Sequence, residues 1–147
     1  MPHVQQLQEG PLAIIGDIHG ELDALDALLT CLDNHHPDHH IVFLGDLADR
    51  GPDSPGVICR VRERMALGAQ CVLGNHELSV LRGKDKGYNR WFFTEGGDWC
   101  HAETGGRVVP MSPLASSSRE DVEELFAGLP LALEREGLRV VHACWDD

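Results

Sequence analysis

Long apolar segments are missing from this chain. No apolar run approaches the roughly 18–20 residues that a membrane-spanning helix needs. The opening stretch MPHVQQLQEG also lacks the basic and apolar regions of a secretory signal. With 147 residues, the chain has the length of about one domain. We therefore expect a single cytoplasmic domain over residues 1–147, without a membrane partner.

Basic residues are also scarce. The sequence has 12 Lys and Arg against 24 Asp and Glu, which gives a formal net charge of −12. Such a surface repels a polyphosphate backbone, so we expect no nucleic-acid partner. An anionic substrate would need bound cations to offset this field locally, because a metal ion is often the largest charge in its site.

Cysteines in a zinc-binding pattern are absent as well. None of the five cysteines forms a C-x-x-C pair, and no zinc-ribbon spacing occurs. Most of them fall within the helices and strands expected below, which predicts buried free thiols. Cys144 stands apart because it lies close to His142.

What the chain does contain is a regular alternation of two patterns. Apolar runs typical of buried strands alternate with the spacing of amphipathic helices over residues 12–16, 21–32, 41–45, 54–67 and 69–74. In the second of these helices, Ser54 is the expected N-cap and Pro55 the first helical residue. Strands that alternate with helices predict an α/β fold with a parallel sheet.

The second half is less regular. Residues 84–118 are rich in Gly, Ser and Pro, and we expect only a short helix there, near residues 90–95. Residues 119–127 predict a further helix, capped by Ser117 or Ser118. The stretches LALERE and LRVVHAC predict two strands around a turn at Gly137.

Polar residues follow each of the three apolar runs. In chain order these are Asp17 and His19, then Asp46, Asp49 and Arg50, then Asn75 and His76. In parallel sheets, ligands bind beyond the carboxyl ends of the strands. Chain direction alone therefore brings these side chains to one rim.

The first two clusters have the residue types of a metal site. Asp17 and His19 lie two residues apart, so their side chains would share a face of an extended segment. Gly16 and Gly20 would allow the tight backbone path of such a loop. Asp46 follows the neighbouring strand, and its two carboxylate oxygens are enough to bridge two ions.

Cations would also remove an electrostatic penalty. Asp17 and Asp46, held about 4 Å apart, would repel each other by about 4 kcal/mol at an effective dielectric near 20. Asn75 would add an amide oxygen and His142 an imidazole. Oxygen and imidazole ligands without thiolate suit manganese, iron or zinc. We expect two divalent ions, with Mn²⁺ favoured.

The remaining residues suit a phosphate ester. The planar guanidinium of Arg50 matches two phosphate oxygens. His76 could protonate the leaving oxygen, with Asp49 orienting its ring and keeping it cationic.

Each cluster alone also has an ordinary explanation. A D-x-H pair occurs by chance, and GD followed by DRG is compatible with a turn and a surface ion pair. GNHE is compatible with a helix start that has Asn75 as its cap and Glu77 near the positive end of the helix dipole. Three clusters after three successive strands favour the metal site instead.

The blocks GDIHG, GDLADRG and GNHE resemble the signature blocks of the calcineurin-like metallophosphoesterases. They are most similar to those of the phosphoprotein phosphatase branch, and WFFTEGGDW and HACWDD resemble its bacterial and phage-type members. The resemblance implies a four-layer α-β-β-α sandwich. It implies that Asp17, His19 and Asp46 hold one metal, and that Asp46, Asn75 and His142 hold the second.

The same resemblance implies an activity. Arg50 would bind the substrate phosphate together with Asn75 and His76, and His76 paired with Asp49 would be the general acid. The expected reaction is hydrolysis of phosphate monoesters by metal-activated water, as in serine/threonine phosphoprotein phosphatases. The alternative is symmetrical hydrolysis of diadenosine tetraphosphate. A second alternative is a catalytically weak metal-binding or interaction module.

One departure from the family pattern is visible. Relatives continue past the block that contains His142 and supply a further His and a phosphate-binding Arg. No His follows His142 in this sequence. We therefore expect a chain truncated at its C-terminus, with part of the second sheet missing. Exposed strand edges would then favour self-association.

Overall fold

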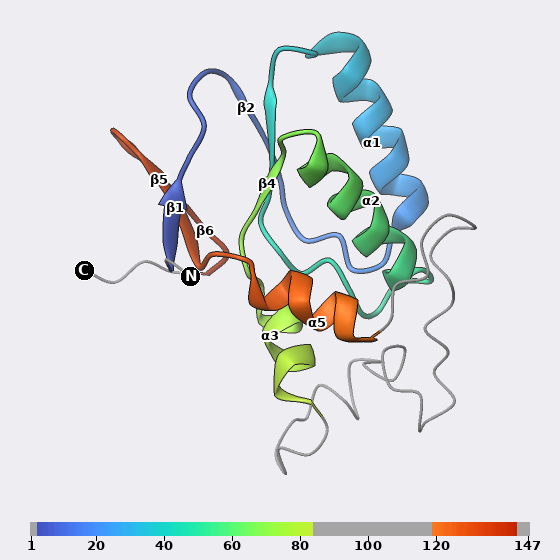
Figure 1. Ribbon diagram of the computed structural model, residues 1–147. Helices are drawn as coiled ribbons and strands as arrows, with labels where there is room; N and C mark the ends of the chain where they lie inside the picture. Colours follow the sequence, from blue (N-terminus) through green and yellow to red (C-terminus); the bar gives the residue numbers. More distant parts are fainter. Residues whose placement is uncertain (1–2, 84–118, 144–147) are drawn as a thin grey trace.

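The computed structural model describes residues 3–83 and 119–143. Figure 1 shows its helices and strands, which are, in chain order, β1 (Val4–Gln6), β2 (Leu12–Ile15), α1 (Leu22–His35), β3 (His40–Phe43), α2 (Ser54–Ala66), β4 (Gln70–Cys71), α3 (Asn75–Arg82), α5 (Arg119–Ala127), β5 (Ala132–Arg135) and β6 (Leu138–Val141). Among the described helices, none combines the length and the apolar character that crossing a bilayer requires.

The sheet β2–β3–β4 is parallel, as the alternation of strands and helices predicts. Ile15 pairs with Phe43, and Phe43 pairs with Cys71, so the carboxyl ends of the strands lie at one edge. Strand β4 is shorter than the predicted residues 69–74. The N–H of Leu73 donates instead to the carbonyl of Pro130 at 2.8 Å, which directs the chain away from β3.

The second sheet has the order β1–β5–β6. Strands β5 and β6 are antiparallel around Gly137, whose φ is 74°, and this confirms the predicted hairpin. Strand β1 is parallel to β5, with Val4 opposite Ala132. The sequence did not predict β1, because V-Q-Q shows no apolar alternation and depends on a partner far along the chain.

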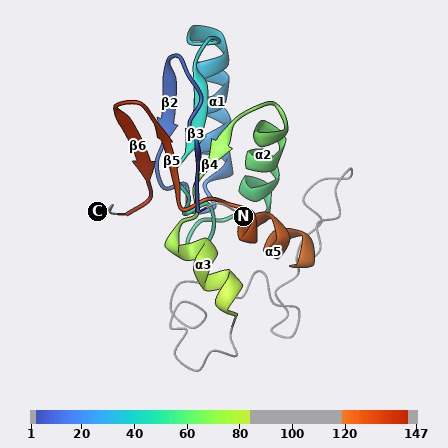
Figure 2. The same cartoon turned by 60° about the vertical axis from the view of Figure 1, so that its left-hand side comes forward.

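The two sheets pack face to face and define two cores. Val42 and Phe43 point to opposite faces of β3, as successive strand residues must. Phe43 packs on the helix side with Leu29 of α1 and Val57 of α2. Val42 packs between the sheets, against Leu133 of β5. Figures 1 and 2 show the resulting order of layers: α1 and α2 lie on one side of β2–β3–β4, and the second sheet lies on the other.

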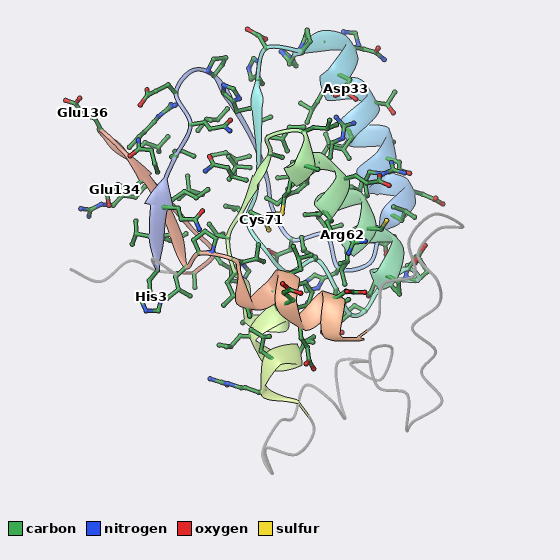
Figure 3. The ribbon with its side chains drawn as sticks, in the orientation of Figure 1. His3, Asp33, Arg62, Cys71, Glu134 and Glu136 are labelled. Atoms are coloured by element: carbon green, nitrogen blue, oxygen red, sulfur yellow. The ribbon has the colours of Figure 1, made fainter. Side chains whose placement is uncertain are left out.

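The outer face of β1–β5–β6 carries no helix within the described part of the chain. Glu134 and Glu136 project from this side of the molecule (Figure 3). The fold is the α/β sandwich predicted from the sequence, and the described residues supply its α-β-β layers.

Two local predictions need correction. The N-cap of α2 is Asp53 and not Ser54, because the Asp53 carboxylate accepts the N–H of Gly56 at 2.8 Å. Cys31 is exposed, whereas Cys59 and Cys71 are buried as predicted. The expectations for residues 90–95 and for the Ser117 or Ser118 cap lie outside the described residues.

Candidate metal centre

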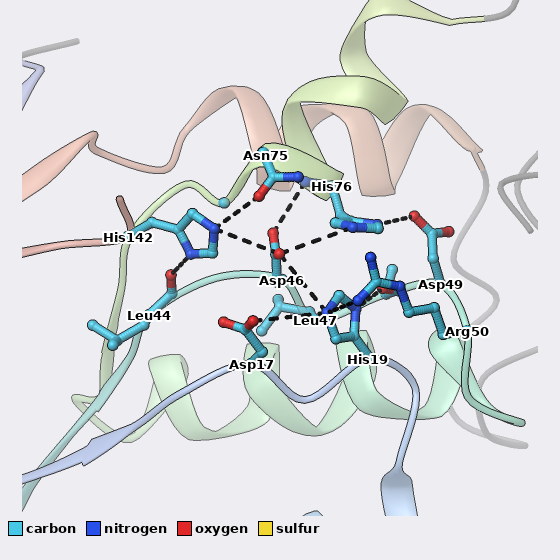
Figure 4. A network of polar contacts seen from close by, with 12 residues as sticks. Asp17, His19, Leu44, Asp46, Leu47, Asp49, Arg50, Asn75, His76 and His142 are labelled. Atoms are coloured by element: carbon cyan, nitrogen blue, oxygen red, sulfur yellow. Dashed lines mark hydrogen bonds and ion pairs between the residues drawn. The ribbon is translucent and has the colours of Figure 1, made fainter. Parts of the chain in front are cut away.

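Loops from both sheets meet beyond the carboxyl ends of β2 and β3 (Figure 4). Asp17 follows β2, Asp46 follows β3, and His142 follows β6. Asn75 and His76 are the first two residues of α3. The structure therefore brings together side chains that are up to 125 positions apart, from Asp17 to His142.

Backbone contacts hold the first two loops together. The carbonyl of Asp46 accepts the N–H groups of Ile18 and His19 at 3.0 and 2.9 Å, and the carbonyl of His19 accepts the N–H of Gly51 at 2.8 Å. A Cβ on Gly51 would lie 2.1 Å from that carbonyl oxygen, so only glycine fits there. These contacts fix the separation of His19 and Asp46.

Gly45 and Gly74 allow a second close approach. Gly45 has a φ of 86°, and a Cβ on it would lie 2.4 Å from the nitrogen of Gly74. A Cβ on Gly74 would lie 2.4 Å from the nitrogen of Asp46. Glycine is also required at Gly20, whose φ is 73°, but not at Gly16, which has open space around its Cβ position.

Strained backbone is concentrated in this centre. Apart from glycine, the described residues with positive φ are His19 (47°), Asp46 (50°), Asp49 (71°) and Arg50 (69°). Left-handed backbone costs roughly 1–2 kcal/mol per residue, and such strain gathers at functional sites. The segment is thus not extended at His19, contrary to the prediction, although Nε2 of His19 still lies 3.8 Å from Oδ2 of Asp17.

Asp46 lies in the middle of the group, and its two carboxylate oxygens have different surroundings. Oδ1 accepts the backbone N–H of His76 at 3.0 Å. Oδ2 faces the Nε2 atoms of His19, His76 and His142 at 3.8, 4.0 and 3.5 Å. These distances exceed the usual hydrogen-bond range of about 2.7–3.2 Å. Two atoms that each bind one ion at about 2.1 Å can lie up to about 4.2 Å apart, so the spacing suits shared cation ligands.

In His19 and His142, the ring nitrogen remote from Asp46 determines which form of the other nitrogen faces this carboxylate. Nδ1 of His19 lies 2.9 Å from the carbonyl oxygen of Ala48, and Nδ1 of His142 lies 2.7 Å from that of Leu44. A carbonyl only accepts, so Nδ1 carries the proton in each ring, and Nε2 of the neutral ring presents a lone pair. Metal-binding histidines are oriented in this way.

Asn75 extends the donor set. Its Oδ1 lies 2.9 Å from Nε2 of His142. Both atoms are acceptors when the His142 ring is neutral, so they form no hydrogen bond to each other. Adjacent ligands of an octahedral ion at about 2.1 Å are about 3.0 Å apart, which matches this spacing. The residues present therefore fit divalent ions.

His76 and Asp49 form a buried pair beside this set. Nδ1 of His76 lies 2.7 Å from Oδ2 of Asp49, and both side chains are almost fully buried. The hydrogen bond to Asp49 raises the pKa of His76; the Asp46 charge adds to this effect, while burial opposes it. The other ring nitrogen of His76, Nε2, lies 4.0 Å from Oδ2 of Asp46, so the ring faces this carboxylate as well.

Asp17 and Arg50 lie at the rim. The Asp17 side chain is 55% exposed, and Nη1 of the exposed Arg50 lies 3.2 Å from Nε2 of His19. The described residues form two groups whose ligand atoms all lie within 4.8 Å of one another. One group is His19, Asp46 and His76, and the other is Asp17, Asp46 and His142. Both groups share Asp46, the carboxylate expected to lie between two ions.

Comparison with known proteins identifies the family. The family profile of the calcineurin-like phosphoesterases matches residues 10–143. The chain belongs to the calcineurin-like phosphoesterase family. The resemblance inferred from GDIHG, GDLADRG and GNHE is thereby confirmed.

Two bacterial relatives of this calcineurin-like phosphoesterase carry the names of different enzymes. The symmetrical bis(5'-nucleosyl)-tetraphosphatase of Janthinobacterium sp. (strain Marseille) is 33% identical over 88% of this chain and 42% of its own length. Serine/threonine-protein phosphatase 1 of Salmonella typhimurium is 37% identical over 58% of this chain and 38% of its own length.

A solved structure is similar as well. The crystal structure of a protein assigned as a diadenosine tetraphosphatase superposes with a TM-score of 0.64 and 28% identity, over 98% of this chain and 55% of that one. The calcineurin-like phosphoesterase chain thus spans about two fifths to about half of the length of these relatives.

Sequence reasoning missed two polar residues of this phosphoesterase centre. Glu77 is fully buried, and its carboxylate accepts backbone N–H groups of Gly74, Asp46 and Leu47. Burial raises the pKa of Glu77, and these hydrogen bonds oppose the rise. The Ser54 hydroxyl accepts the N–H of Asp49 at 2.8 Å. For Glu77, the spacing signal in the sequence was its place three positions after Gly74, from which a Glu side chain can reach back to the start of its helix.

Proposed function

We propose that this calcineurin-like phosphoesterase domain binds two divalent ions, preferably Mn²⁺, through Asp17, His19, Asp46, Asn75 and His142. The observation that carries the proposal is the position of Asp46 Oδ2, which lies 3.8 Å from Nε2 of His19 and 3.5 Å from Nε2 of His142, residues that follow strands of different sheets. Bound ions would ionise a water and offset the charge of the phosphoryl oxygens.

The protein's own residues would do the rest. Arg50, exposed at the rim, would bind the phosphoryl group with its planar guanidinium, together with the amide of Asn75. His76 would donate a proton to the leaving oxygen, because Asp49 holds its ring 2.7 Å away and stabilises the imidazolium. The buried carboxylates of Asp49 and Asp46 would keep His76 in one orientation.

For the substrate we propose a dinucleoside tetraphosphate first. The relative that aligns over 88% of this chain carries the name symmetrical tetraphosphatase. A hollow of about 450 Å³ borders the centre at Asn75 and His142, with Leu78 and Leu131 among its apolar lining. An apolar hollow beside a phosphate site would suit a nucleobase.

A phosphoprotein is the second candidate substrate. It is supported by the match to the Salmonella typhimurium serine/threonine-protein phosphatase. The open rim at Asp17 and Arg50 would also admit a phosphorylated side chain on a protein surface.

Turnover with Mn²⁺ tests the proposal. The chain is assayed on p-nitrophenyl phosphate, diadenosine tetraphosphate and a phosphopeptide. We expect His76→Asn to lower kcat by about 10²–10⁴-fold, the usual contribution of a general acid, and Asp46→Asn to abolish turnover. The controls His36→Asn and Asp38→Asn change exposed residues of the turn before β3 and should leave the rates unchanged.

The substrates separate the candidates. Faster turnover of diadenosine tetraphosphate than of the phosphopeptide supports the first assignment, and the reverse order supports the second. Mn²⁺ binding without turnover of any substrate would contradict catalysis by this chain and favour the metal-binding module.

A further inference from the structure

One buried charge has no part in the proposed reaction. Glu77 is the third residue of α3, and its side chain is fully buried. Taking a carboxylate out of water costs several kcal/mol unless hydrogen bonds compensate. Repulsion from the charge of Asp46, another carboxylate of the same centre, adds to this cost. A carboxylate buried under these conditions needs compensating hydrogen bonds.

The Glu77 carboxylate bonds to two separate loops. Oε2 accepts the N–H of Gly74 at 3.0 Å and that of Asp46 at 2.8 Å, and Oε1 accepts the N–H of Leu47 at 2.8 Å. The bond to Gly74 is one half of a capping box, in which the third helical residue reaches back to the N–H of the N-cap residue. The other two bonds reach the loop after β3, which a helix cap does not need.

A bond in the opposite direction completes a clamp. Oδ1 of Asp46 accepts the N–H of His76 at 3.0 Å. The loop after β3 and the first turn of α3 are therefore joined by side-chain bonds that run both ways. With Oδ1 engaged, the carboxylate of Asp46 cannot rotate freely, and Oδ2 is left facing the three imidazoles.

The clamp also acts on a strained position. Asp46 has a φ of 50°, a conformation that persists only when its surroundings impose it. The N–H of Asp46 is fixed by Glu77, and its carbonyl is fixed by Ile18 and His19. Glu77 thus supplies the constraint from the α3 side.

We infer that Glu77 is a positioning residue, which holds the backbone of Asp46 so that Oδ2 faces the metal-binding space. The inference rests on the metal centre of the proposed function. It assigns to Glu77 a role through Asp46, without contact with ion or substrate. Partners of this outer kind typically contribute 10–100-fold to metal affinity.

The test compares Mn²⁺ affinity in Glu77→Gln and in the unchanged chain. Glutamine has the same shape, but its NH₂ group would face a backbone N–H in place of an acceptor. We expect a Kd for Mn²⁺ that is about 10–100-fold higher, from titrations followed by the EPR signal of free Mn²⁺. Glu9→Gln, an exposed and distant matched change, should leave the Kd unchanged.

Folding is measured separately, from the Tm of each metal-free variant, and affinities are compared well below the lowest Tm. Equal Kd values for Glu77→Gln and the unchanged chain would overturn the inference and leave the metal centre standing. No Mn²⁺ binding by the unchanged chain would overturn the centre itself, and the inference with it.

If Glu77→Gln does not fold, hydrogen exchange in the unchanged chain tests the inference. The amides of Asp46, Leu47 and Gly74 lie outside helices and strands, yet each donates to Glu77. We expect hydrogen exchange at all three to be as slow as in β3. Fast exchange at Asp46 and Leu47 would contradict the clamp.

Discussion

Ser54 contributes to the centre through one hydroxyl group. The sequence predicts an N-cap, because a serine precedes a proline at the start of a helical pattern. Asp53 takes that role, and the Ser54 hydroxyl accepts the N–H of Asp49 at 2.8 Å instead. This bond fixes Asp49, which in turn orients His76.

Ser54→Ala would leave the buried N–H of Asp49 without its acceptor. Removing one partner of a buried hydrogen bond costs about 1–3 kcal/mol, so we expect the free energy of unfolding to fall by that amount. Urea denaturation measures it. In the control Ser79→Ala, the lost hydroxyl donates to the exposed Asn75 carbonyl of its own helix, and the change should stay within about 0.5 kcal/mol. Equal effects of the two changes would contradict this role of Ser54.

The sequence predicted which residues form the candidate centre, but not the contacts that hold them. Asp17, Asp46 and Asn75 follow strands, and chain direction alone indicates that strand ends converge. The same sequence does not reveal that Glu77 faces inward, because its bonds depend on how α3 meets the loop after β3. The carbonyl of Leu44 that orients His142 is a backbone group, and no sequence pattern marks it.

Elements with their own periodic pattern were predicted well. Helix α1 (Leu22–His35) forms where the leucine spacing predicts a helix over residues 21–32, and α5 forms at the predicted residues 119–127. Strand β1 and the shortness of β4 were not predictable, because both depend on contacts with the segment near β5. The predicted two-sheet sandwich itself came from resemblance to the family, since no local pattern indicates how β1 pairs.

The packing of α1 on α2 includes an ion pair that responds to pH. Arg64 of α2 donates two hydrogen bonds to the Asp33 carboxylate of α1, at 2.8 and 2.6 Å. The bond to Arg64 holds the pKa of Asp33 below its ordinary value. Arg60 and Asp26 join the same helices nearby. Because the folded pKa is lowered, the stabilisation is present above the unfolded pKa of Asp33 and is lost as pH falls through the folded one.

A double-mutant cycle with Asp33→Asn and Arg64→Gln measures this pair. We expect a coupling free energy of about 0.3–1 kcal/mol at pH 7, since Asp33 is half exposed and exposed pairs are weak. The coupling should shrink between about pH 5 and pH 3 as Asp33 is protonated, because its folded pKa lies below the ordinary Asp value of about 3.9, and it should weaken in high salt. A coupling that stays constant over this pH range would contradict the assignment to the Asp33 charge.

At the scale of the whole molecule, the centre connects the two sheets. His142 is the one predicted ligand that comes from β1–β5–β6, while the others follow the strands of β2–β3–β4 or begin α3. Its ring is oriented by the Leu44 carbonyl and faces Asp46 at 3.5 Å. A cytoplasmic location, the lack of nucleic-acid and membrane partners, and self-association stay predictions from composition and strand edges.

A cation bound at this junction should stabilise the sandwich as a whole. At a Mn²⁺ concentration of about 100 Kd, binding adds about 2.7 kcal/mol to the free energy of unfolding. For a domain of this size that corresponds to a rise in Tm of roughly 5–10 °C, measured by circular dichroism with and without a chelator. In His142→Asn most of the rise should disappear, because the link to the second sheet is broken, whereas His36→Asn should keep it. Hydrogen exchange adds a local readout: Mn²⁺ should slow exchange at the amides of β6 in the unchanged chain. A full Tm rise in His142→Asn, or β6 amides that ignore Mn²⁺, would contradict a metal centre shared between the sheets.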